Sequence, residues 1–480
     1  MEKLFMGIDV GTQGVRAALV SESGSVVAEA SRPFALTQES RQEQSPAEWG
    51  AKTLDVLDEL ILSLTPGVDR DAIAAIGIDS TSGTVIPLGE GNQPVHAALM
   101  YSDPRSAAAG RECTDIAKRF VRSGYTGFGA SSGLAKMVWF VQTYPAKAAA
   151  IRKWVHAADY LVGQLSGSYD VTDYTNALKS GYDLSAGQWP SYLTTHLPLR
   201  RDWFQRVVPS GTPIGYLRDE LAARWGLYQT QVVVGMTDGC ASQVASGAVN
   251  PGDWNTTIGT TLVIKGVTTT AINDPEGRLY SHRHPDGFWM PGGASNTGAD
   301  WVSTDFGRDG AVLDRLNEEA AARVPTGRMA WPLKQTGERF PFIAPQAQGF
   351  IPEGLTPAER FAASMEGVAY IERLAYDLVE ALSGERPTAV YTAGGGSNSD
   401  IWLEIRSSVL NLPIYKCRET SGAVGAAITA ASKTHYTSLA EAAAQMTKVE
   451  REVAPRQAWV DGYEVNYRQF VEELKKRKYI

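Results

Sequence analysis

One order of predicted elements occurs twice in this chain, and it constrains the fold more than any single motif does. The first copy begins with two β-hairpins over residues 6–28 and continues with a helix that starts after Ser45. It then reaches a buried strand in "AIAAIGID" at 72–79. The Ser-Pro-Ala-Glu segment predicts the helix start, because serine caps a helix and proline suits its first turn. Apolar residues at helical spacing follow it.

The second copy repeats this order. "WNTTIGTTLVIKGV" at 254–267 predicts a hairpin, Thr-Pro-Ala-Glu after residue 355 starts a helix, and "TAVYTA" at 388–393 predicts a strand. The shared order therefore predicts an α/β fold of two duplicated units. Residues of about 85–235 and 270–355 are expected to be insertions in the first and second copies.

Length and charge narrow the class of protein. A chain of 480 residues is too long for one core, and we predict domains at 1–248 and 249–440 with a helical extension at 441–480. The net charge of −8 disfavours nucleic acid or an anionic membrane as partner, and no apolar run is long enough to span a bilayer. Three scattered cysteines and a start without a signal-peptide pattern favour the cytoplasm and small-molecule partners.

The glycine-threonine turn at the first hairpin tip has the residues of an anion-binding site, although no helix follows it. A phosphate loop of the usual kind needs a helix directly after its glycines, whereas here a second strand follows. Turn N–H groups and threonine hydroxyls can hold phosphate oxygens instead, and the second copy has a matching Gly-Thr tip. The predicted phosphate contacts are Gly11, Thr12, Gln13, Gly259 and Thr260. Asp9, at the strand end, is suited to Mg²⁺ held through water.

Asp238 stands between a buried strand and a run of small residues at helical spacing. It is either a helix-capping aspartate or a base that accepts a hydroxyl proton during phosphoryl transfer. Gly394, Gly395 and Gly396 follow the second copy's strand, where they would let a flat ligand such as adenine approach, with Asn398 at its edge.

Two other chemistries lack support in the sequence. His282 and His284 are too few for a zinc site and are expected to form an exposed pair on a hairpin. A Ser-His-Asp hydrolase is also disfavoured, because the GxSxG segment of that class is missing.

Taken together, six segments resemble the FGGY carbohydrate kinases, over about residues 7–431. They are the Asp-Val-Gly-Thr of the first tip, "YSDPR" at 101–105, Asp238 with its small-residue helix, the second Gly-Thr-Thr tip, "GERFP" at 337–341 and "AGGGSNSDIW" at 393–402. The resemblance implies two ribonuclease-H-like domains of the actin and hexokinase superfamily, with a cleft between them.

The resemblance also implies ATP and Mg²⁺ as cofactors and Asp238 as the catalytic base. It implies sugar contacts from Ser82, Asp103, Arg105 and Asp238. A homodimer is left open as the assembly.

Within the family, "TDYTNALKSGYD" at 172–183 and "GIDSTSGTVIP" at 77–87 look most like D-ribulose kinases of the plant and cyanobacterial type. The expected reaction is therefore the ATP-dependent conversion of D-ribulose to its 5-phosphate. Two alternatives remain: the same chemistry on D-xylulose, ribitol or glycerol, and an ATP-binding clamp or sensor without transferase activity.

Overall fold

The computed structural model describes residues 2–64, 68–121 and 124–480, which form two compact units. Unit 1 contains the chain up to Gly247, together with His282–Trp289 and Glu419–Lys448. Unit 2 contains Ala248–Ser281, Met290–Arg418 and Val449–Ile480. Glu419–Lys448 thus packs with unit 1, although the sequence-based division assigns most of that segment to residues 249–440.

Unit 1 is built on a mixed sheet with the strand order β11-β12-β5-β1-β2-β3. The predicted hairpins are confirmed: β1 (Leu4–Gly11) pairs antiparallel with β2 (Gly14–Ser21), and β2 pairs antiparallel with β3 (Val26–Pro33). The predicted buried strand is β5 (Ile73–Ser80), which lies parallel to β1. The sheet is completed by β11 (Pro213–Tyr216), β12 (Gln231–Val233) and β13 (Met236–Thr237).

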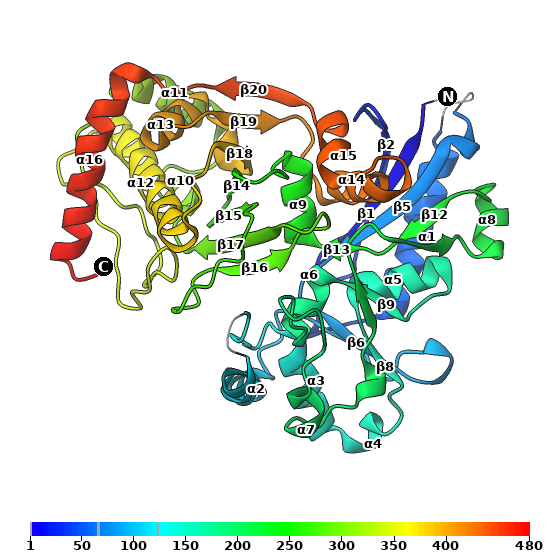
Figure 1. Cartoon of the computed structure of the whole chain (residues 1–480). Helices are drawn as coiled ribbons and strands as arrows, with labels where there is room; N and C mark the ends of the chain where they lie inside the picture. Colours follow the sequence, from blue (N-terminus) through cyan, green and yellow to red (C-terminus); the bar gives the residue numbers. More distant parts are fainter. Residues whose placement is uncertain (1, 65–67, 122–123) are drawn as a thin grey trace. The chain divides into compact units, whose positions relative to one another are not determined.

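Helices cover this sheet (Figure 1). The predicted capped helix is α1 (Pro46–Leu62), in which the Ser45 hydroxyl accepts a hydrogen bond from the Glu48 N–H at 3.3 Å. Helix α14 (Gly422–Thr434) packs on β1 and β5. The remaining helices of the sheet layer are α5 (Ala157–Ser166), α8 (Asp219–Trp225), α9 (Asp238–Ser246) and α15 (Leu439–Met446).

The predicted first insertion forms its own apolar core, but it is shorter than expected. It ends before β11 and β12, which belong to the main sheet. The expected boundary was too late because the aromatic-rich composition continues beyond the insertion. Trp225, for example, packs in the core of the main sheet. Its helices are α2 (Ala107–Phe120), α3 (Gly133–Thr143), α4 (Pro145–Ala148), α6 (Tyr174–Ala177) and α7 (Tyr192–Thr195). Its short strands are β6 (Val85–Leu88), β7 (Ala98–Leu99), β8 (Lys153–His156), β9 (Val171–Asp173) and β10 (Arg206–Val208). β4 (Glu43–Gln44), which precedes the insertion in sequence, pairs with β7.

Unit 2 repeats the order of elements. The hairpin of β14 (Asp253–Ile258) and β15 (Leu262–Gly266) is followed by α12 (Pro357–Ser383) and by β18 (Ala389–Ala393), which pairs parallel with β14. The predicted duplication of the fold is thereby confirmed. The other elements are β16 (Tyr280–Arg283), β17 (Trp289–Ser295), β19 (Ile414–Cys417), β20 (Val449–Val453), α10 (Asp300–Asp305), α11 (Gly310–Ala321), α13 (Asp400–Leu410) and α16 (Gln457–Lys476).

Two strands inside the predicted second insertion, β16 and β17, belong to the sheet that contains β14 and β15. β17 pairs antiparallel with β15, as β3 pairs with β2 in unit 1. The insertion is therefore shorter than residues 270–355. In the part of the chain that the structure describes, no helix combines the length and the apolar character that crossing a membrane would need.

A buried carboxyl group ties α12 to α16 in the core of unit 2. Oε1 of Glu366 accepts hydrogen bonds from the Thr326 N–H at 2.8 Å and from the Tyr463 hydroxyl at 3.0 Å. Burial nevertheless raises the pKa of Glu366 to about 7, because the hydrogen bonds only partly offset the loss of water.

This pKa predicts a pH-dependent change in stability. Between an unfolded pKa of about 4.5 and the folded value of about 7, only the folded protein keeps the Glu366 proton, so stability falls as pH rises. Glu366→Gln removes this titration. As the pH rises from 4.5 to 8, the unfolding free energy of the variant minus that of wild type should therefore increase by on the order of 3 kcal/mol. Denaturant unfolding across this range measures the difference.

Glu353→Gln is the matched control, because Glu353 is exposed on a loop of the same unit. The difference in unfolding free energy between Glu353→Gln and wild type should stay constant with pH. A constant difference for Glu366→Gln as well would show that Glu366 is ionised in the folded protein.

Candidate functional site

Three aspartates lie at the carboxyl ends of neighbouring parallel strands in unit 1. β1 and β5 pair with Asp9 opposite Asp79, and β13 pairs with β5 so that Met236 lies opposite Asp79. Asp238 follows β13 directly. Ligands of open α/β sheets bind outside the carboxyl ends of such strands. The sequence predicted Asp9 and Asp238 as functional residues but missed Asp79.

Asp79 is fully buried, and neither of its carboxylate oxygens has a hydrogen-bond donor among the described residues. Burial raises its pKa well above the usual range, and the charges of Asp9 and Asp238 raise it further. The neighbouring Asp9 carboxylate can bond with it only through a shared proton or a cation. Three carboxyl groups therefore interact electrostatically at this edge of the sheet.

Asp9 opens into a pocket of about 760 Å³ within unit 1. Burial raises the pKa of Asp9, while the guanidinium of Arg16, 3.7 Å from its carboxylate, acts in the opposite direction. The pocket has the size of a small-molecule site. Its lining includes the whole predicted first tip, Gly11, Thr12 and Gln13, together with Tyr101 and Ser102 of the "YSDPR" segment.

Asp238 is the first residue of α9, and Thr237 holds the capping position without a side-chain capping bond. The Asp238 carboxylate accepts a hydrogen bond from the Gly239 N–H at 2.7 Å. A carboxylate at this end of a helix is stabilised in its ionised form by the helix dipole.

The predicted sugar contacts Asp103 and Arg105 are bonded to each other. Asp103 is fully buried and accepts two-pronged hydrogen bonds from the Arg105 guanidinium, whose Nη2 also donates to Glu43 at 2.6 Å. Buried Lys136 donates to the Asp103 carbonyl, and burial lowers its pKa to about 8. In this geometry Asp103 orients Arg105, and Arg105 is the partly exposed group.

Ser82 lies in the loop between β5 and β6. Its hydroxyl oxygen is buried and has no hydrogen-bond partner in residues 2–64, 68–121 and 124–480. A buried hydroxyl without a partner is costly and suits a position that a ligand completes.

In unit 2, the second predicted tip is the turn between β14 and β15, where Gly259 is half-buried and Thr260 is exposed. The three glycines in the loop after β18 lie in different surroundings. A Cβ on Gly394, where φ is +83°, would lie 2.6 Å from the Ile258 carbonyl oxygen, and one on Gly396 would lie 2.8 Å from Ile258 Cβ. A Cβ on Gly395 would meet open space. Asn398 is exposed, and its carbonyl oxygen accepts a bond from Lys416 at 3.4 Å.

The glycine loop predicts unequal effects of alanine. Gly394→Ala places a side chain at positive φ and against backbone, and should cost about 1–3 kcal/mol of stability. Gly395→Ala should change stability by less than about 0.5 kcal/mol, because nothing lies near its added methyl group. Thermal unfolding of the two variants side by side measures this contrast. Equal losses would mean that Gly395, like Gly394, serves the loop's own packing.

The predicted exposed histidine pair is wrong. His282 and His284 are 2% and 0% exposed, because the turn that carries them packs under the connection between α14 and α15. Lys433 Nζ donates to the Pro285 carbonyl, and the Asp286 carboxylate accepts from the Leu439 N–H at 2.9 Å. Among the residues described here, no group of three or more His, Cys, Asp or Glu side chains is placed to hold a metal ion.

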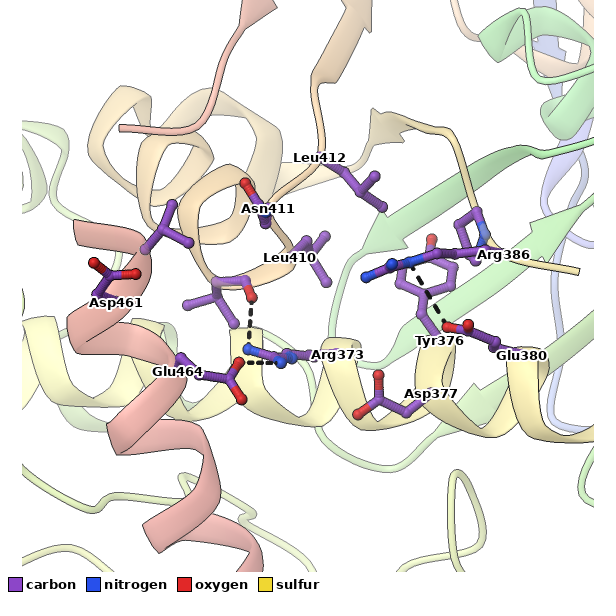
Figure 2. A pocket seen from close by; sticks show the side chains of 13 residues that line it. Arg373, Tyr376, Asp377, Glu380, Arg386, Leu410, Asn411, Leu412, Asp461 and Glu464 are labelled. Carbon is purple, nitrogen blue, oxygen red and sulfur yellow. Dashed lines mark hydrogen bonds and ion pairs between the residues drawn. The ribbon is translucent and has the colours of Figure 1, made fainter. Parts of the chain in front are cut away.

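A second, smaller pocket lies in unit 2 between α12, α16 and the end of α13 (Figure 2). Its volume of about 190 Å³ is below the range of ligand sites for molecules of nucleotide size. Arg373 points across it to Glu464, and Arg386 lies 3.7 Å from Glu380. The pocket contains no residue predicted for catalysis or binding.

Duplicated α/β units with glycine-threonine hairpin tips and carboxylates at the strand ends define a class of two-domain phosphotransferases. Residues 4–245 match the N-terminal domain of the FGGY family of carbohydrate kinases, and residues 254–434 match its C-terminal domain. The chain belongs to this family. It is an enzyme of the kinase class that uses a sugar hydroxyl as acceptor.

Individual relatives cover nearly the whole chain. A xylulose kinase of Bacillus subtilis (strain 168) is 26% identical over 96% of this chain and 94% of its own length. A gluconokinase of Bacillus licheniformis is 26% identical over 85% of this chain and 83% of its own. The crystal structure of xylulose kinase from Rhodospirillum rubrum superimposes with a TM-score of 0.86 at 26% identity, over 99% of both chains.

Proposed function

We propose that this chain transfers the γ-phosphoryl group of ATP to a hydroxyl of a small ketose in the cytoplasm. The observation that carries the proposal is the set of strand-end carboxylates beside a pocket lined by the Gly11-Thr12 tip. Membership of a carbohydrate kinase family supports the reaction type.

Asp238 is the proposed base. In the transfer step, the sugar hydroxyl oxygen bonds to the γ-phosphorus while the bond to the bridging oxygen breaks and ADP leaves with the electron pair. Asp238 takes the hydroxyl proton. The remaining work is positioning and charge stabilisation, because the transition state of phosphoryl transfer is loose.

Backbone N–H groups of Gly11 and Gly259 and the hydroxyls of Thr12 and Thr260 are the proposed phosphate contacts, with Gln13 beside them. Gly394–Gly396 and Asn398 are proposed to face adenine, with Gly395 leaving the room for it. Asp9 fits Mg²⁺ held through water, since it lines the pocket and its side chain is 14% exposed. Mg²⁺ in such a site neutralises charge on the β- and γ-phosphate oxygens.

Replacing the base tests this assignment. Asp238→Asn keeps the shape and hydrogen-bonding of the side chain but cannot accept a proton. We expect kcat to fall about 10²-fold or more, with ATP affinity nearly unchanged. Steady-state ADP release and nucleotide titration measure the two quantities. A variant that keeps more than about a third of wild-type turnover would make Asp238 a structural residue of the helix start.

Two ketoses are candidate acceptors. The names of relatives that span this chain support D-xylulose, and the 77–87 and 172–183 segments, which resemble D-ribulose kinases, support D-ribulose. These sugars differ in configuration at one hydroxyl-bearing carbon. A polar group that pairs with only one epimer gives roughly tenfold to hundredfold preference. The partnerless hydroxyl of Ser82 is the proposed group.

ADP release should be compared across D-xylulose, D-ribulose, ribitol, glycerol and gluconate at saturating ATP. We expect one ketopentose to give the highest kcat/KM and Ser82→Ala to narrow the gap between the two. Higher kcat/KM with gluconate or a polyol would overturn the ketose assignment and leave the kinase assignment intact. No ADP release with any acceptor would favour the ATP-binding clamp.

A further inference from the structure

The segment at 172–183 packs against the strand that leads to Asp238. It contains the end of β9 and the short helix α6, and its residues Asp173 and Thr175 are fully buried. The hydroxyl oxygen of Thr175 accepts a hydrogen bond from the Thr237 N–H at 2.9 Å. Thr237 is the residue directly before Asp238. This segment therefore bonds to the backbone one residue before the proposed base.

The Thr175 hydroxyl has a fixed direction because Asp173 holds it. The Asp173 carboxylate accepts hydrogen bonds from the Thr175 N–H at 2.8 Å and from the Thr175 hydroxyl at 2.7 Å, and Asn176 and Ser210 donate to it as well. Burial raises the pKa of Asp173, and these hydrogen bonds act in the opposite direction. An ionised carboxylate can only accept, so the Thr175 hydroxyl donates to it and its oxygen is left to accept from Thr237.

This hydrogen bond matters because β13 is too short to fix the start of α9 alone. β13 has 2 residues, and its pairing in the sheet is with β5. Thr237 is 1% exposed, so loss of the Thr175 oxygen would remove the acceptor of a buried N–H, which is unfavourable. Thr237 also holds the capping position of α9 without a side-chain capping bond. The ladder with β5 and the bond to Thr175 thus hold the backbone that carries Asp238.

We propose that Thr175, oriented by Asp173, is a positioning residue for the base, because its hydroxyl fixes the Thr237 N–H and thereby the place of the Asp238 carboxylate. The inference rests on the proposed role of Asp238 in proton transfer. Thr175 and Asp173 touch no reacting atom in it and act through the peptide before Asp238. Misplacing a reacting group by about 1 Å can lower a rate about 10²-fold, so a hydrogen bond this close to the base affects kcat.

Replacing the hydroxyl alone tests this role. Thr175→Val keeps the size of the side chain but removes the acceptor of the Thr237 N–H. We expect kcat to fall about 10- to 100-fold, by the same factor with each acceptor that wild type uses. KM for ATP should stay within about threefold of wild type, because the variant affects only the chemical step. Thr175→Ser retains the hydroxyl and should restore most of kcat. Steady-state ADP release by the full chain measures these values.

Thr230→Val is the matched control for the loss of a buried threonine hydroxyl in unit 1. The Thr230 hydroxyl donates to the Ile73 carbonyl at 2.7 Å, at the first residue of β5, whereas Asp238 follows β13 at the carboxyl end of that sheet. Both valine variants should melt below wild type, but only Thr175→Val should lose kcat. Equal losses of kcat would show a general effect of destabilisation and would overturn the proposal.

Combining Thr175→Val with Asp238→Asn tests whether Thr175 acts through the base. Once the proton acceptor is gone, its placement no longer matters, so the double variant should keep the kcat of Asp238→Asn within about threefold. If Thr175→Val instead lowers kcat by the same factor in both backgrounds, Thr175 acts independently of Asp238 and the proposal is wrong.

The same measurements separate this inference from the proposed function. Wild-type kcat in Thr175→Val, while Asp238→Asn loses activity, would overturn the role of Thr175 and leave the kinase proposal standing. Full turnover in Asp238→Asn, or no ADP release by wild type with any acceptor, would overturn the assignment of the base and the role of Thr175 with it.

Discussion

The close approach of α14 to β1 and β5 is the contact on which the rest of unit 1 depends. A Cβ on Gly7 would lie 1.7 Å from the Ala423 carbonyl oxygen, and one on Gly77 would lie 2.4 Å from that of Ala426. The helix backbone thus rests directly on the strands, which only glycine permits at these positions. On its other side, a Cβ on Gly425 would lie 2.0 Å from the Ala241 carbonyl of α9. Sheet, α14 and α9 are locked together, and the acidic strand ends lie at the start of both helices.

The positive groups beside the acidic strand ends explain why an acidic site can serve a phosphate-handling enzyme. Carboxylates repel phosphate, so the same residues that accept a proton or hold a cation need positive charge beside them when ATP is bound. Arg16 supplies part of it next to Asp9, and helix N-terminal N–H groups supply more. Arg105, oriented by buried Asp103 and bonded to Glu43, adds a guanidinium on the "YSDPR" side. Asp103, Arg105 and Glu43 are therefore held in place by one another.

Local patterns predicted most of the fold. The Ser45 and Thr356 helix starts, the hairpins at both tips and the strands β5 and β18 depend on residues near one another in sequence, and the structure confirms them. The insertions and the histidine pair depend on distant contacts, and there prediction failed. The place of strands β11, β12 and β17 is set by pairing with the main sheets. His282 and His284 are buried by α14 and α15, which follow them by about 150 residues, so hairpin-like local sequence carried no sign of burial.

The sequence by itself determined that the chain is a two-copy α/β kinase, because capping, periodicity and glycine turns act over a few residues and the family motifs are read in order. It also contains the Gly-Ile-Asp segment twice, at 7–9 and 77–79. Only the tertiary structure decided that these copies pair in register and that Asp79 lies buried beside Asp9 under Gly422. The register of a parallel pair is set by packing on both faces of the sheet, and burial by a helix more than 340 residues away, which no local pattern encodes.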